Sequence, residues 1–164
     1  MQHKGSVFYD FDFSIKRPLY SIRQLFRDLK CCLDRIRKGY CVKDLWEIDT
    51  WFLRIMPEML EEFDRRKNSY PNAFWEQCVQ KHESELPVSK EKFLISGARD
   101  FPDLYKKISA EAYEAWGNTL QEMADLMRKA QEIKWKSVII GEEHLPYQKK
   151  ALELFQTYFD DLWD

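Results

Sequence analysis

The chain of 164 residues contains few of the residues that interrupt regular structure, with 5 Gly and 6 Pro. Turns should therefore be few and the segments between them long, which favours helices. No apolar run approaches the roughly 18 residues that a membrane span needs. No signal peptide opens the chain. We therefore expect a soluble, cytoplasmic protein with no membrane contact.

Motifs that bind nucleotides or catalyse hydrolysis are also missing. The sequence has no G-x-x-x-x-G-K-[ST], G-x-G-x-x-G, H-E-x-x-H or G-x-S-x-G. The three histidines, His3, His82 and His144, lie in polar segments, where a surface position is the better interpretation. We predict no catalytic residue, no metal site and no cofactor, and we do not expect an enzyme.

Four cysteines are too few and too irregularly spaced for a disulfide framework. Cys31 and Cys32 are adjacent, Cys41 and Cys78 stand alone, and no C-x-x-C occurs. Adjacent cysteines rarely bridge each other, so the simplest expectation is reduced thiols in a cytosolic setting.

The composition supplies both a core and a solvated surface. Hydrophobic residues make up 45% of the chain, aromatic residues 15% and charged residues 33%, with a formal net charge of −2. These values predict a single domain over 1–164, mainly α-helical, built as a bundle of about five helices. Residues 1–17 are expected to form an N-terminal strand or arm, because Val7 to Phe13 alternates in the manner of a short strand.

The densest apolar stretch runs from Tyr40 to Phe63, and its spacing predicts a central helix. Gly39 ahead of it suits the end of a preceding helix, because glycine tolerates the left-handed terminating conformation. Cys41 near the N-cap and Asp44 three residues later give half of a capping box, while Pro57 predicts a kink. Two rows of side chains follow the helical repeat: Leu45, Ile48, Phe52, Met56, Met59, Leu60 and Phe63 in the first, and Trp46, Asp49, Leu53 and Pro57 in the second.

Asp49 is the unusual residue of this stretch, because it lies between Trp46 and Trp51. A carboxylate buried among aromatic rings needs a partner. It is either a structural acceptor for an indole N–H or a basic side chain, or a carboxylate on the wall of a ligand pocket. In the second case bases would stack on tryptophan and phosphates would meet arginine. The candidate ligand-binding residues are Trp46, Asp49, Arg37, Arg35 and Tyr40.

Four further helices and one ambiguous segment are expected. A first helix covers about Leu19 to Lys38, a short one Pro71 to about Glu83, and the longest begins at Pro102. Ser84 to Ser96 is unclear, and its Phe93-Leu94-Ile95 could be a strand or a buried link. The last helix follows Pro146, and its expected core face contains Leu152, Phe155, Phe159, Leu162 and Trp163.

Basic residues concentrate on the first helix. From Lys16 to Lys43 there are nine basic and two acidic residues, a local excess of seven. Such a stripe can meet phosphate, an acidic partner or the protein's own acidic elements. No aromatic residues alternate with it, so nucleic acid is not an expected partner. The candidate protein-interaction stripe is Arg23, Arg27, Lys30, Arg37 and Lys38.

Two acidic turns on the longest helix resemble the magnesium-binding turns of all-α nucleotide pyrophosphohydrolases. They are Glu111-x-x-Glu114 and Glu122-x-x-Asp125. In that family the two turns lie on separate helices that face each other. Here they follow one another along a single helix, about 12–16 Å apart at 1.5 Å per residue, so they cannot share one ion without a break at Gly117.

Two stretches together resemble a family of small, uncharacterised proteins encoded by tailed phages and related mobile elements. The first is YCVKDLWEIDTWF and the second is ALELFQTYFDDLWD, with a weaker match at Tyr70-Pro71 and Trp75. Cys41 stands where the family has serine. The resemblance implies an α-helical fold and a phage origin but brings no activity, so no catalytic residue is carried over. The matching positions are Gly39, Tyr40, Asp44, Trp46 and Asp49, then Leu152, Leu154, Phe155, Tyr158, Phe159, Leu162, Trp163 and Asp164.

These observations favour a non-enzymatic binding protein that acts in the cytoplasm of an infected host. It would counter a host defence either by sequestering a nucleotide signal or by occluding a host protein. One alternative is a structural or protein-interaction accessory of the phage, and another is a metal-dependent nucleotide pyrophosphohydrolase. The sequence does not decide whether the chain forms a homo-oligomer.

Overall fold

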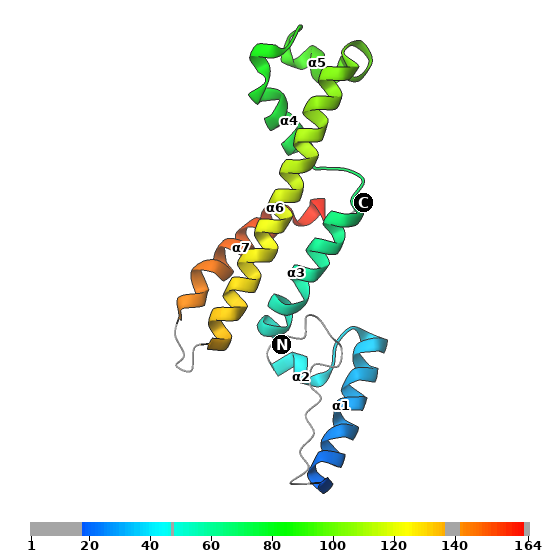
Figure 1. Cartoon of the computed structure of the whole chain (residues 1–164), viewed down its shortest axis with the longest axis vertical. Helices are drawn as coiled ribbons and strands as arrows, with labels where there is room; N and C mark the ends of the chain where they lie inside the picture. Colours follow the sequence, from blue (N-terminus) through cyan, green and yellow to red (C-terminus); the bar gives the residue numbers. More distant parts are fainter. Residues whose placement is uncertain (1–17, 47, 137–141, 163–164) are drawn as a thin grey trace. The chain divides into compact units, whose positions relative to one another are not determined.

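The computed structural model describes residues 18–46, 48–136 and 142–162 (Figure 1). Of these residues 88% are helical and none lies in a strand, so the prediction of a mainly α-helical protein is confirmed. The described ranges hold seven α-helices and three 3₁₀ turns, more than the five helices expected. The strand expected at Val7 to Phe13 lies outside them.

The chain divides into two compact units, 1–58 and 59–164, and the division falls within α3. The prediction of a single domain stays a prediction. In chain order the helices are α1 (Pro18–Lys38), α2 (Val42–Trp46), α3 (Ile48–Arg66), α4 (Asn72–Lys81), α5 (Lys90–Asp100), α6 (Pro102–Lys136) and α7 (Leu145–Thr157); the 3₁₀ turns are η1 (Glu83–Glu85), η2 (Glu142–His144) and η3 (Phe159–Asp161).

The expected first helix is confirmed as α1, and it ends as the sequence predicts. Gly39 adopts a positive φ of 81°, and its N–H donates to the carbonyl of Arg35 at 2.9 Å. A residue with a Cβ would be strained in that left-handed conformation. The chain reverses at this glycine and enters α2.

The expected central helix is described as α2, which ends at Trp46, and α3, which begins at Ile48; position 47 lies outside the described residues. Leu45, Ile48 and Met59 of the first row are exposed, so the core position expected for that whole row is wrong. The buried apolar residues of α3 come from both rows: Leu53 and Pro57 belong to the second row and Leu60 to the first.

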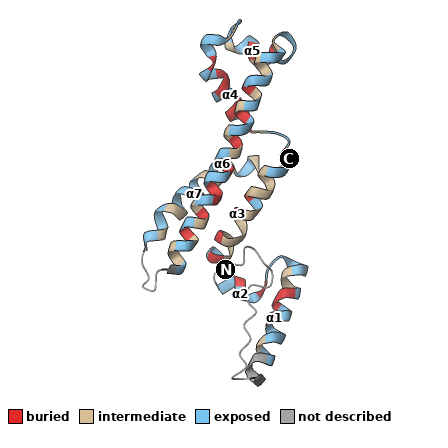
Figure 2. Ribbon diagram, viewed as in Figure 1, coloured by how far each residue is buried: buried red, intermediate tan, exposed pale blue. Residues whose placement is uncertain are grey.

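The second unit is built on α6, and a regular apolar stripe of this helix lies in its core. Helices α4, α5 and α7 all contact it, and Figure 2 shows buried residues along its length. Phe74 of α4, Trp116 of α6 and Tyr158 beyond α7 form an aromatic cluster with ring centroids 5.3–5.4 Å apart. The fully or nearly fully buried members of the stripe are Ile108, Ala112, Trp116, Leu120, Met123 and Met127.

Gly117, in the interior of α6, lies against the end of α3. A Cβ at this position would be 2.9 Å from Oδ1 of Asp64 and 3.2 Å from Nζ of Lys67. Those two side chains form an ion pair, and the Lys67 ammonium also lies 4.1 Å from the centroid of the Tyr113 ring. The glycine therefore makes room for a charged pair packed on the helix.

The ambiguous segment around Phe93 is helical, so neither a strand nor a link is correct. Ser89 caps α5 by accepting from the N–H of Lys92 at 3.4 Å, a serine cap that was missed beside the helix-breaking Pro87. Phe93 is completely buried and lies 6.2 Å from Trp75.

The core face expected for the last helix is partly wrong. Leu152 and Phe159 are exposed, whereas Ala151 is fully buried and Tyr158 packs into the aromatic cluster. The reason is that α7 ends at Thr157 and a 3₁₀ turn follows, which rotates Phe159 away from the line that a continuous helix would follow. Trp163 lies outside the described residues.

We predict that Trp116→Ala lowers the free energy of unfolding by about 3–5 kcal/mol, because a large, fully buried aromatic side chain is lost. The matched control is Trp135→Ala on the same helix, where the side chain is 65% exposed and the loss should be about 1 kcal/mol or less. Urea denaturation of the three proteins measures both values. Equal losses at the two positions would contradict the core assignment.

Candidate functional site

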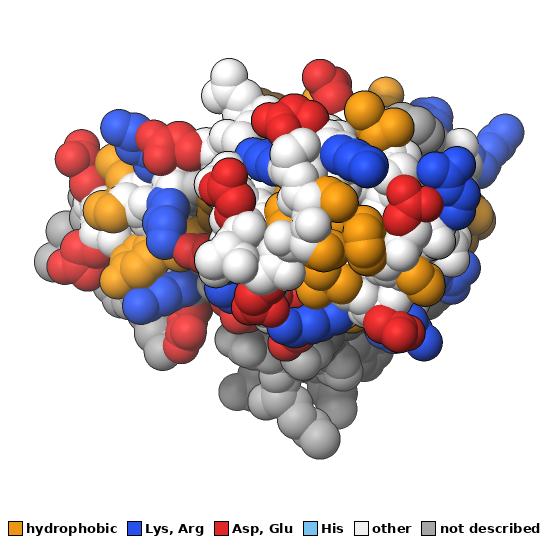
Figure 3. Space-filling view, turned by 90° about the horizontal axis from the view of Figure 1, so that it is seen from above, with side chains coloured by type: hydrophobic (Ala, Val, Ile, Leu, Met, Phe, Trp, Pro, Cys, Tyr) orange, Lys and Arg blue, Asp and Glu red, His pale blue; other side chains and the backbone are white. Residues whose placement is uncertain are grey.

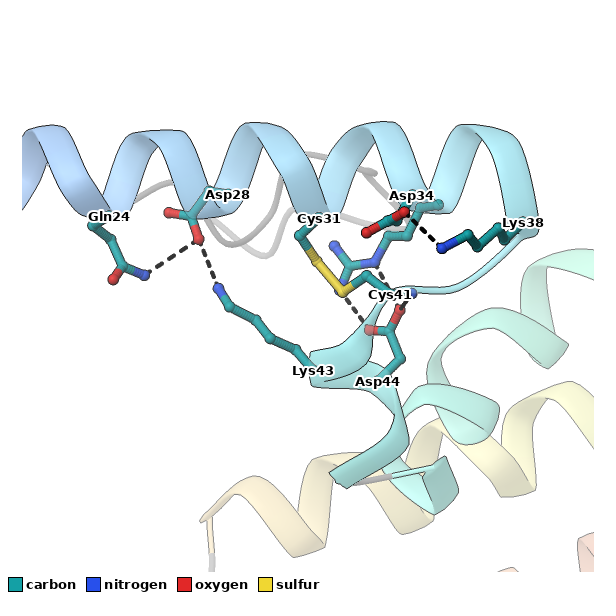
Figure 4. The surroundings of a disulfide bond; sticks show 9 residues. Gln24, Asp28, Cys31, Asp34, Lys38, Cys41, Lys43 and Asp44 are labelled. Atoms are coloured by element: carbon teal, nitrogen blue, oxygen red, sulfur yellow. Dashed lines mark hydrogen bonds and ion pairs between the residues drawn. A yellow bond between two sulfur atoms is a disulfide. The ribbon is translucent and has the colours of Figure 1, made fainter.

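A disulfide joins α1 to the start of α2. Cys31 and Cys41 are ten positions apart, their Cα atoms are 5.1 Å apart, and both residues are buried (Figure 4). The expectation that all four cysteines are reduced is therefore wrong in this structure, since only Cys32 and Cys78 are free. The reversal at Gly39 brings the two positions together, which spacing along the sequence alone did not reveal.

A buried ion pair lies beside the disulfide. Arg35 donates to both carboxylate oxygens of Asp44, at 2.5 and 3.0 Å, and their side chains are 8% and 5% exposed. The N–H of Cys41 also donates to Asp44 at 2.7 Å, which is the half capping box predicted from the sequence. Burial opposes ionisation of Asp44, but the hydrogen bonds from Arg35 and Cys41 outweigh it and hold its pKa below the ordinary value.

A second carboxylate, Asp28, continues the polar contact between α1 and α2. It is buried and accepts from Nζ of Lys43 at 2.7 Å and from the Gln24 amide at 3.2 Å (Figure 4). Gln24, Asp28, Cys31 and Arg35 follow one another at helical spacing. Their side of α1, which we call the anchored face, therefore contacts α2 through polar groups and sulfur.

The apolar face of α1 points away from α2. Leu29 and Cys31 are two positions apart, which separates them by about 200° around a helix with 3.6 residues per turn. Figure 2 shows α1 mainly as exposed. This exposure has a physical cause, since polar groups make the anchoring contacts. The exposed apolar residues are Ile22, Leu25, Phe26, Leu29, Leu33 and Ile36.

The candidate interaction stripe lies beside the apolar face and is exposed at every position: Arg23, Arg27, Lys30, Arg37 and Lys38. Lys38 pairs with Asp34 at 3.0 Å and Arg27 donates to Gln24. In the part of α1 that the structure describes, Arg23, Lys30 and Arg37 form no ion pair. The helix carries six basic and two acidic residues, an excess of four positive charges.

The candidate ligand-binding residues differ in their surroundings, and their role as a site stays a prediction. Arg35 uses its guanidinium on Asp44, so it is not free to meet a phosphate. Trp46 is 85% exposed, and Tyr40, Arg37 and Asp49 are exposed as well. Burial was the reason for assigning Asp49 a special role, and that reason no longer holds. Sequence reasoning instead missed Asp28 and the pairing of Arg35 with Asp44.

His82 is buried, so its expected surface position is wrong. Nε2 lies 2.7 Å from Glu111 and Nδ1 lies 3.0 Å from Glu85. These two hydrogen bonds, that to Glu111 first, raise the pKa of His82 above its ordinary value. With both ring nitrogens engaged, the imidazole has no nitrogen left to act as a base for the thiol of Cys78, and the pKa of that buried thiol is raised.

The acidic turns of α6 are used in ion pairs. Glu111 pairs with His82 and Lys81, Glu122 pairs with Lys150 at 2.6 Å, and Asp125 accepts from Gln121 at 3.0 Å. Among the described residues no group of three or more potential ligands is placed to hold a metal ion. Glu111 and Glu122 therefore tie α6 to the end of α4 and to α7.

Two other parts of the surface carry weaker evidence of a binding site than α1. On the face shown in Figure 3, acidic and basic side chains are interspersed around hydrophobic ones, so that face has no field of one sign. An open groove of about 750 Å³ follows α7, and Leu145, Pro146 and Leu152 line it together with polar residues of both signs. No candidate residue lines this groove.

Comparisons with known protein families, curated proteins and solved structures found no match. The resemblance to phage proteins therefore stays a prediction. No helix in the described part of the chain has the length and apolar character needed to cross a membrane.

We predict that His82 makes the stability of the second unit fall as the pH rises above the ordinary histidine pKa of 6.5. The hydrogen bonds that raise the folded-state pKa of His82 stabilise the protein fully below 6.5, and this contribution is lost as pH rises through the folded-state pKa. The urea midpoint should therefore fall over that pH range. His82→Gln should reduce this slope and His144→Gln should keep it. An unchanged slope in His82→Gln would show that the two hydrogen bonds add no stability.

A second prediction compares two aspartates of the first unit. Asp44→Asn removes the carboxylate that accepts two hydrogen bonds from the buried Arg35 guanidinium and should cost about 3 kcal/mol. Asp49→Asn changes an exposed residue in the first turn of α3, where loss of a favourable helix-dipole interaction costs about 0.3–1 kcal/mol. Denaturation of both variants gives the order. A larger loss for Asp49→Asn would return that residue to the buried role expected from the sequence.

Proposed function

We propose that this chain is a non-enzymatic binding protein whose binding element is α1, and that its partner is a protein with an apolar groove rimmed by acidic residues. The single observation that supports this most strongly is the exposure of the apolar face of α1 next to the exposed basic stripe. Contiguous exposed apolar surface with a polar rim is typical of interaction sites.

The spacing of the apolar residues suits a groove in another protein. Ile22, Leu25, Phe26, Leu29, Leu33 and Ile36 follow the i, i+3, i+4, i+7 repeat of helices that dock by one face. Phe26 is 68% exposed and is the largest side chain of the row. Aromatic anchors of this kind contribute a large share of binding energy when a pocket buries them.

Charge favours a different protein over a second copy of this chain. In an antiparallel pair of α1 helices, the basic flank of one copy would lie next to the basic flank of the other. Each α1 carries four more positive than negative charges, so self-association brings like charges together. An acidic rim instead pairs with Arg23, Lys30 and Arg37, which have no ion pair within the described part of α1.

The biological setting follows from the resemblance and is part of the proposal. In a phage-encoded protein, the partner of α1 would be a cytoplasmic host protein that the chain occludes, in keeping with a counter-defence role. A nucleotide signal has less support, because Arg35 is used internally and Trp46 stands exposed. The ion pairs of Glu111 and Glu122 likewise favour binding over hydrolysis.

The test uses a synthetic four-heptad peptide with Leu at a and d and Glu at e and g, which presents an apolar seam with acidic flanks. We expect fluorescence titration to show binding that weakens as salt is raised, because exposed charges contribute to it. Phe26→Ser should weaken binding about tenfold or more, and Arg23→Glu with Lys30→Glu should weaken it further.

The matched controls are Phe159→Ser and Lys149→Glu, which change an equally exposed aromatic residue and an exposed lysine of the second unit. Both should bind the peptide like the wild type. Equal effects at Phe26 and Phe159 would contradict the assignment to α1. Binding to vesicles of anionic phospholipid without binding to the peptide would overturn the proposal in favour of a lipid surface.

A further inference from the structure

We infer that the Cys31–Cys41 disulfide is a redox switch for α1: the oxidised chain holds the helix ready for binding, and reduction releases it from α2. We call the disulfide that holds α1 to the start of α2 the clamp, and its existence follows from contacts within the first unit. The effect of the clamp on binding rests on the proposed function.

Few contacts other than the disulfide hold α1 to α2. Among the described side chains of α1, those of Asp28, Cys31, Cys32 and Arg35 are buried, and none of them is a large hydrocarbon side chain. The Lys43 ammonium that reaches Asp28 is 44% exposed, and an ion pair with one exposed partner adds little. The Arg35–Asp44 pair is buried, and the desolvation of its two charges offsets much of their attraction.

The disulfide acts at the centre of these contacts. Cys31 lies between Asp28 and Arg35 on the anchored face, and Cys41 is the residue whose N–H binds Asp44 (Figure 4). Breaking the S–S bond therefore frees the chain where the buried ion pair and the capping hydrogen bond meet. Reduction also leaves two buried thiols, Cys31 and Cys41, in place of the covalent bond between α1 and the start of α2. Most of the stability of a helix in a protein comes from the packing of one face and not from intrinsic propensity, so α1 depends on this anchor.

Opening and closing of the clamp is a two-electron exchange with a small-molecule thiol and disulfide pair, such as reduced and oxidised glutathione. To close it, the Cys31 and Cys41 thiols lose two protons and two electrons, an S–S bond forms, and the disulfide reagent becomes two thiols. To open it, two small-molecule thiols supply the electrons and protons and are joined as a disulfide.

The consequence for binding is one of preorganisation. A helix that is already formed and fixed at one side loses less conformational entropy when its apolar face docks. Reduction lets α1 fray, so the partner must bind a helix and order it at the same time. The oxidised chain should then be the tight-binding form.

The first experiment measures amide hydrogen exchange of the full chain, oxidised and after treatment with dithiothreitol. Amides of α1 and α2 should exchange about tenfold faster or more after reduction, because local opening of these helices becomes easier. Amides of α6 should not change. The double variant Cys31→Ser/Cys41→Ser should match the reduced protein, and the control Cys32→Ser/Cys78→Ser should keep the redox response. Equal exchange of α1 in both states overturns the clamp.

The second experiment repeats the acidic-peptide titration in glutathione buffers of graded redox ratio. Affinity should follow the oxidised fraction and differ about tenfold between the two ends. Equal affinity in both states overturns the switch while the proposed function stands. If the peptide binds in neither state, the proposed function fails, and the exchange data alone then decide whether the disulfide holds α1.

Discussion

The buried ion pair between Arg35 and Asp44 decides which side of the first helix faces inward. It is made by two groups that cannot be left buried alone, and it is supported by the Cys41 N–H and by the neighbouring disulfide. Because these partners lie on the polar side of α1, the apolar side remains outside. In this unit, satisfaction of charged groups determines the arrangement, and the hydrophobic surface is left exposed.

The second unit follows the opposite rule. Its helices pack on the apolar stripe of α6, and its charged groups form ion pairs around that core, such as Lys150 with Glu122 at 2.6 Å. His82 is the exception that is drawn inside, because the two carboxylates that face its ring favour its charged form. The two units therefore differ in what stabilises them, and we expect redox conditions to affect the first and pH to affect the second.

The apolar periodicity of the sequence predicted the helices well, but it predicted poorly which of their faces are buried. The bounds of α1 and the start and stripe of α6 follow from Pro18, Gly39, Pro102 and a regular apolar repeat. The buried side of α1 could not be predicted, since its partners Cys41, Lys43 and Asp44 reach it only after the reversal at Gly39. Burial of Asp49 was wrongly expected for a related reason, because a place between two tryptophans in the sequence does not decide which side of the helix faces the core.

The cysteine arrangement has a practical consequence for chemical labelling. All four cysteines of the chain are buried, two of them in the disulfide and two as thiols. Burial first, and then the charge of Glu111, raises the pKa of the Cys78 thiol and lowers its nucleophilicity at neutral pH. The native oxidised chain should therefore react slowly with maleimides. A single cysteine introduced on its surface would then carry a fluorophore or spin label at one defined position, with no need to remove the natural ones.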